Sequence, residues 1–159
     1  MCLAIKWSQK EKNKFLDDQD FVDGMITVYK VVGVEDNIYY PVCQDTRIPY
    51  DIGVSKADTT RDCEDSRERR YSSGYHFFYE KSRANEVLEH IKKWDSDPKK
   101  RAASEKKLND DGEVLRDEYK VVKCKVKRSW IADIGTQERK IMITLVTKKA
   151  IFPDPRGEE

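Results

Sequence analysis

The stretch GYHFFYEKSRANEVLEHIKKWD, residues 74–95, decides the fold class because it runs from a strand directly into a helix. Residues 74–79 form a compact aromatic run, which is typical of a strand. Ser82 can cap a helix that follows. The apolar residues of that helix recur at helical spacing, namely Ala84, Val87, Leu88, Ile91 and Trp94. A single apolar stripe suits packing on a sheet, so we expect one main amphipathic helix over about 82–95.

The part of the chain before this unit contains one strong strand signal. Residues 25–34, MITVYKVVGV, are dense in β-branched and aromatic side chains, and a polar turn over 35–37 follows them. Residues 38–43 read as the second arm of a hairpin, at an edge because Pro41 cannot donate to a ladder. Residues 44–73 show no clean period, so we expect a long loop there with one short strand around Ile52.

The sequence after the helix returns to strands. Asp97 and Pro98 disfavour continuation of the helix, and residues 99–118 are mostly polar, which predicts a mobile insertion or a solvated turn. Within 120–128 the valines and Cys124 fall on one face of a strand, and Lys123, Lys125 and Lys127 fall on the other. Further strands are expected over 131–134, 140–146 and 150–152.

This order of elements predicts an α+β fold. We expect a mainly antiparallel sheet, one main amphipathic helix and a long polar insertion. The domain boundaries that follow are a loosely attached leader over 1–24, with a short helix capped by Ser8, a single domain over 25–152, and a disordered tail over 153–159.

Composition limits the environment and the partners. Charged residues make up 38% of the chain, yet the net charge is only +1, so any binding of nucleic acid needs a local basic patch. The four scattered cysteines predict reduced thiols in a cytoplasm. No apolar run approaches the length of a membrane span, so we expect a soluble protein that does not contact membranes.

The titratable residues form no known catalytic or metal motif. His76 and His90 lack the spacing of zinc ligands, and no phosphate-binding loop, dinucleotide fingerprint or serine-hydrolase motif occurs. We therefore expect no metal and no cofactor. Cys63 lies in a charged run whose carboxylates oppose formation of a thiolate.

Three short motifs carry a family resemblance. Residues 29–32 read Y-K-V-V, and residues 74–78 read G-Y-H-F-F before a helix. Residues 123–126 read K-C-K-V and lie in a late strand before Gly135. In this order the chain resembles small phage and bacterial proteins of unassigned function, over roughly residues 25–152. The resemblance implies a fold and an origin in a phage or mobile element, without an activity.

A second resemblance is to the ADP-ribosyltransferase fold, in which an aromatic strand leads into a helix and a late acidic residue orients the ribose of NAD. It implies NAD as a ligand, Glu138 as the catalytic carboxylate and Ser73 beside the aromatic strand. The acidic pair and the Ser-Thr-Ser strand typical of that family are missing from this chain.

The sequence favours a non-enzymatic interaction protein that binds a host macromolecule. Tyrosine, tryptophan and arginine are enriched in interface hot spots, and several lie in or near the expected loops. The alternative is that these aromatic side chains fill a small core. A host protein is the expected partner, and nucleic acid is the second. The candidate binding residues are Arg69, Arg70, Tyr71, Tyr75, His76 and Trp130.

Overall fold

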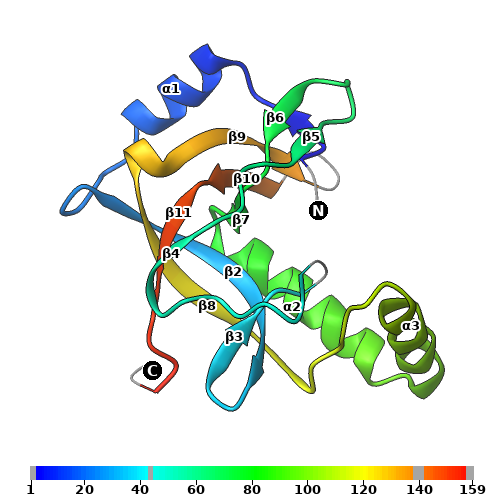
Figure 1. Cartoon of the computed structure of the whole chain (residues 1–159). Coiled ribbons are helices and arrows are strands. Elements are labelled where there is room, and N and C mark those ends of the chain that lie inside the picture. The colour runs from blue at the N-terminus through cyan, green and yellow to red at the C-terminus, as the bar shows by residue number, and fades with distance from the viewer. Residues whose placement is uncertain (1–2, 43–44, 138–141, 157–159) are drawn as a thin grey trace.

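The computed structural model describes residues 3–42, 45–137 and 142–156, and it has an α+β fold with a mainly antiparallel sheet. In these residues the main sheet has nine strands in the order β1-β9-β10-β7-β2-β8-β11-β4, with β3 paired to β2 (Figure 1). Strands β5 and β6 form a separate hairpin. The strands are β1 Ile5–Lys6, β2 Met25–Glu35, β3 Ile38–Tyr40, β4 Gly53–Lys56, β5 Asp62–Glu64, β6 Arg70–Ser72, β7 Tyr75–Phe78, β8 Glu118–Lys127, β9 Ile131–Gln137, β10 Met142–Thr147 and β11 Lys149–Phe152.

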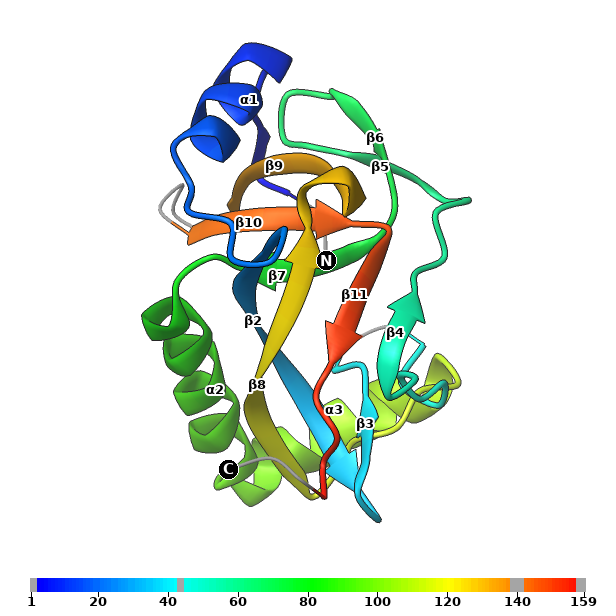
Figure 2. The same cartoon turned by 90° about the vertical axis from the view of Figure 1, so that its left-hand side faces the viewer.

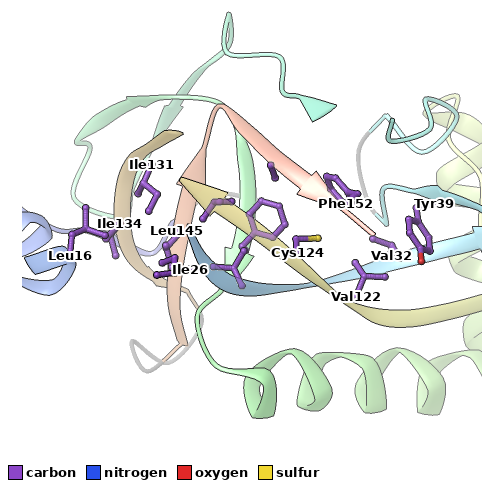
Figure 3. Packing of buried hydrophobic residues seen from close by; sticks show 14 residues of the cluster. Leu16, Ile26, Val32, Tyr39, Val122, Cys124, Ile131, Ile134, Leu145 and Phe152 are labelled. Atoms are coloured by element: carbon purple, nitrogen blue, oxygen red, sulfur yellow. The ribbon is translucent and has the colours of Figure 1, made fainter. Parts of the chain in front are cut away.

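The longest pairing joins β2 to β8 and separates two apolar layers. Alternate residues of both strands, among them Val28 and Val122, enter the main core. The opposite face packs against helix α2, Lys81–Asp95, through Val31 and Val121. Figure 3 shows the main core on one side of β2 and β8 and α2 along the other.

Helix α2 covers the range that the apolar stripe predicts, but two details differ. It begins at Lys81 after Glu80, so Ser82 lies inside the first turn and does not cap it. It is also one of three α-helices in the described residues, beside α1, Gln9–Asp17, and α3, Pro98–Asp110. The expectation of a mobile insertion or turn over 99–118 is therefore wrong for most of its length.

Helix α3 begins at the residues that predicted only the end of α2. The side chain of Asp97 accepts from the backbone N–H groups of Lys99 and Lys100, and Pro98 stands at the first helical position, where its missing N–H costs nothing. The same dipeptide thus ends one helix and starts the next. Helix α3 buries no residue and projects from the body (Figure 1).

Residues 44–73 hold more strand than the single one expected around Ile52. Strand β4 pairs with β11, and β5 pairs with β6 across a tight turn over 65–69. The Asp65 carboxylate forms this turn by accepting from the backbone N–H groups of Arg67 and Arg69, both at 2.9 Å. Burial alone would raise the pKa of Asp65, but hydrogen bonds from Lys6, Arg69 and Arg67 hold it below its usual value.

The segment expected as a loosely attached leader is part of the fold. Strand β1 pairs with β9, and Leu3 and Leu16 are each only 2% exposed. Ser8 caps α1 as predicted, in a reciprocal capping box with Glu11. The hairpin predicted over 25–43 is confirmed for β2 and β3. The rest of its second arm includes Cys43, which lies outside the described residues, as do residues 157–159 of the predicted tail.

Candidate binding surface

Two predicted binding residues, Tyr71 and His76, contribute to packing. Tyr71 is 5% exposed, and its hydroxyl accepts from the backbone N–H of Leu3 at 2.6 Å. The His76 ring lies 6.2 Å from the Tyr71 ring, centroid to centroid. Burial, followed by the charge of Lys30, lowers the pKa of His76 to about 4, so the imidazole is neutral at pH 7.

Tyr75 is also held inside the fold. Its hydroxyl lies 2.7 Å from Oγ of Ser55 and donates to the carbonyl of Lys56 at 2.8 Å. Its ring packs edge-on against Tyr50 and Phe152. Burial raises the pKa of this phenol. For Tyr71 and Tyr75 the structure thus favours the alternative in which aromatic side chains fill the core.

The remaining predicted binding residues lie in two separate places, the β5–β6 hairpin and the 3-10 helix that follows β8. The Arg69 guanidinium donates to the backbone carbonyl of Lys6 in β1 at 2.8 Å. Arg70 is 76% exposed, and its Nε lies 3.5 Å from a carboxylate oxygen of Glu64. Trp130 is half-buried in the short 3-10 helix η1, Arg128–Trp130, after β8. The structure does not bring the six residues into one surface.

Ser73, the partner proposed for Glu138, has a structural role. Its hydroxyl donates to the carbonyl of Asp58 at 2.7 Å and accepts from the backbone N–H of Arg61 at 3.2 Å. Glu138 lies outside the described residues. The predicted convergence of the two on a pocket therefore stays a prediction.

A different set of side chains does gather on one surface. They project from the side of β8, β11 and β4 opposite the main core, because Cys124, Ala150 and Phe152 on the same strands point into it. Figure 2 shows the three strands side by side. They are Lys123, Lys125 and Lys127 on β8, Lys149 on β11 and Lys56 on β4, and we refer to these five as the lysine face.

The strand register fixes how the lysine face is arranged. Ile151 lies opposite Lys125 on one side and opposite Val54 on the other, so the three strands share this face. Lys149 lies directly opposite Lys56. All but Lys149 are exposed.

The charges of the lysine face are not neutralised within the described residues. No ion pair within 4.0 Å joins any of the five to a carboxylate there, although Arg128, next to Lys127, pairs with Asp17 at 2.7 Å. The ammonium group of Lys127 lies 5.4 Å from the centre of the Trp130 ring. The face therefore presents an excess of positive charge on a molecule whose net charge is only +1.

Apolar side chains border the lysine face at β4, an edge strand of the sheet. Val54 is 53% exposed, and Ile52, just before β4, is 56% exposed. Exposed apolar groups beside a charged surface are common at interaction sites.

The sequence signals part of this surface. Alternation within β8 placed Lys123, Lys125 and Lys127 on a solvated face, as the structure shows. Lys56 and Lys149 were missed because they reach the surface only through the pairing of β4 and β11, which are far apart in the chain. No local pattern signals such a pairing.

Among the described residues, no group of three or more histidine, cysteine, aspartate or glutamate side chains could hold a metal ion. No helix in that part of the chain is both long and apolar enough to cross a membrane. No family model matches the chain, and neither the curated proteins nor the solved structures include a significant match to it.

Proposed function

We propose that this protein is a non-enzymatic interaction protein that binds an anionic host macromolecule through the lysine face. The observation that carries the proposal is the set of five lysines on three adjacent strands, without a carboxylate partner in the described residues. The resemblance to phage proteins is the reason to expect a host partner, met in the cytoplasm.

The spacing of these lysines makes their charges act together. Residues two apart on a strand are about 7 Å apart, and neighbouring strands are about 4.8 Å apart. Both distances are below the screening length of about 8 Å at physiological ionic strength. An anion on this face therefore experiences the summed potential of several ammonium groups.

The pair Lys56 and Lys149 supports a functional origin of the face. Like charges directly opposite each other on neighbouring strands destabilise a sheet. This chain has two lysines in that arrangement on β4 and β11. A role in binding an anion explains why such a pair is present despite its cost.

The substitution Lys56→Glu tests this explanation directly. It places a carboxylate opposite Lys149, so we expect the free energy of unfolding to stay unchanged or to rise by up to about 1 kcal/mol. Affinity for an anionic partner should fall at the same time. Urea unfolding and a binding assay on the same preparation measure the two effects. A variant that loses stability without losing affinity would make Lys56 a structural residue only.

The proposal itself is tested with two anionic probes, a labelled DNA duplex and a labelled poly-glutamate. The variant Lys123→Gln/Lys125→Gln/Lys127→Gln should lose at least roughly tenfold in affinity for whichever probe binds. The control Lys10→Gln/Lys106→Gln/Lys107→Gln removes the same charge from α1 and α3 and should retain wild-type affinity. Failure of both probes to bind, or equal losses in the two variants, would overturn the proposal.

A further inference from the structure

We infer that the anionic partner of the lysine face is the phosphate backbone of a nucleic-acid duplex, bound without preference for base sequence. This inference rests on the proposed function and names the class of partner for the same surface. Three features of the face carry it: the type of cation, the absence of a stacking platform and the number of charges.

The three strands that form the face, β4, β8 and β11, contain lysines and no arginine. A lysine ammonium acts as a compact point charge, whereas arginine presents a planar fork that makes paired hydrogen bonds of fixed geometry. A surface built only from ammonium groups suits phosphates, whose contacts position a protein on the duplex and carry no sequence information. Binding should therefore be independent of base sequence.

The aromatic residues next to the face do not form a stacking platform. Proteins that bind single strands stack the bases on exposed aromatic rings. Tyr29, directly opposite Lys123 on β2, packs against the cluster under α2. Trp130 packs partly against the main core, with Lys127 over its ring. Without stacking, charge density decides, and a duplex carries one charge per about 1.7 Å along its axis.

The number of lysines sets the salt dependence. Each phosphate neutralised on a duplex contributes about 0.9 to the slope of log affinity against log salt concentration. Five contacts therefore predict a slope of about −4.5, which is a loss of roughly 500-fold between 50 and 200 mM salt. Removing one lysine should make the slope shallower by about 0.9.

The test is fluorescence anisotropy of labelled DNA and RNA duplexes, a single-stranded DNA of the same length and poly-glutamate, each titrated over this salt range. We expect both duplexes to bind more tightly than the single strand and two unrelated duplex sequences to bind equally. Lys125→Gln should make the slope shallower, Lys125→Arg should restore it, and Lys106→Gln on α3 should leave it unchanged. Unfolding midpoints verify that every variant is folded.

The outcomes separate the inference from the proposed function. Binding of poly-glutamate but of no duplex overturns the inference and leaves an acidic protein surface as the partner. Tighter binding of the single strand, or a preference for one duplex sequence, also overturns it. Binding of only the DNA duplex, or of only the RNA duplex, supports the inference and shows which of the two nucleic acids is the partner. If neither the nucleic acids nor poly-glutamate binds, both proposals fall.

Discussion

At the scale of single residues, Gly135 shows how a missing side chain permits a strand pairing. A Cβ at this position would overlap the carbonyl oxygen of Ile5 and lie 2.9 Å from Cδ1 of Leu3. Strand β1 can approach β9 this closely only because residue 135 is glycine. Gly33 offers a comparison, since a Cβ there would lie 2.7 Å from Cγ of Arg116, which is a side-chain atom and not part of a paired backbone.

The substitution Gly135→Ala should therefore destabilise the protein more than Gly33→Ala. We expect a loss of about 3 kcal/mol for Gly135→Ala, because backbone atoms must separate. We expect a smaller loss for Gly33→Ala, because the Arg116 side chain must move and strain its contacts to Glu35 and Thr46 while the strands stay paired. Urea unfolding of both variants measures the difference. Equal losses would show that β1 adapts to the added methyl group.

His76 gives a second prediction at this scale, on pH. Its Nδ1 lies 3.2 Å from the carbonyl oxygen of Gly74, so Nδ1 carries the proton, and Nε2 is buried without a hydrogen-bond partner in the described structure. Burial lowers the pKa of His76 to about 4. In the unfolded chain a histidine titrates near pH 6.5, so below that pH the unfolded state binds a proton that the folded state excludes.

Stability should accordingly fall as the pH drops from about 6.5 towards 4. The wild type should lose on the order of 1–2 kcal/mol more than His76→Gln between pH 7.5 and 5, allowing for partial exposure of the ring. His90→Gln, which removes the other histidine, is the matched control. Unfolding curves of the three proteins at both pH values give the comparison. Parallel pH dependence in wild type and His76→Gln would mean that His76 has the same pKa in the folded and the unfolded protein.

At the scale of elements, helix α3 is held by few contacts. An isolated helix as short as α3 is only marginally stable in water. Helix α3 also buries none of its side chains. Besides the Asp97 cap, the indole of Trp94 donates to Oγ of Ser104 at 2.6 Å, and Lys100 lies 5.1 Å from the centre of the Trp94 ring. Arg101 pairs with Asp95 at 3.0 Å.

Removal of the Trp94 side chain should therefore release α3 without unfolding the sheet. In Trp94→Ala we expect faster hydrogen exchange over residues 98–110 and an almost unchanged urea midpoint. Leu88→Ala, on the face of α2 that packs on the sheet, should instead lower the midpoint. Undisturbed exchange over 98–110 in Trp94→Ala would show that the cap and the ion pairs suffice.

The elements also show what the sequence can and cannot predict. Strands with an alternating or dense apolar pattern, such as β2 and β8, are found where expected, because the signal is local. Strands β4, β5 and β6 are short and depend on partners elsewhere or on the Asp65 turn, so their own residues show no period. The lysine face divides in the same way. Its β8 row follows from alternation, and its Lys56 and Lys149 row follows only from tertiary pairing.

At the scale of the whole molecule, the N-terminal segment completes the core that the later strands begin. Leu16 joins the main core, Leu3 packs with Tyr71 and Val146, and Phe15 contacts Trp7 and Tyr79. Replacing one buried leucine with alanine costs about 2–5 kcal/mol, and a domain of ordinary stability has only about 5–15 kcal/mol in total. The loss of both leucines together approaches that total.

The fragment 25–159, in which the segment is absent, should therefore fail to fold cooperatively, although the sequence places the domain boundary near residue 25. We expect lost near-UV circular dichroism and binding of an apolar dye, because Val146 loses its packing partner Leu3 and the core cluster of Ile134 loses Leu16. Fragment 1–152 is the matched control, since the described residues beyond β11 contribute no side chain to the three clusters of buried residues, and Arg156 donates its backbone N–H to the nearby Asp154 carboxylate. It should unfold near the wild-type midpoint. A cooperative unfolding transition in fragment 25–159 would show that residues 1–24 are not needed for folding and that β2 through β11 suffice.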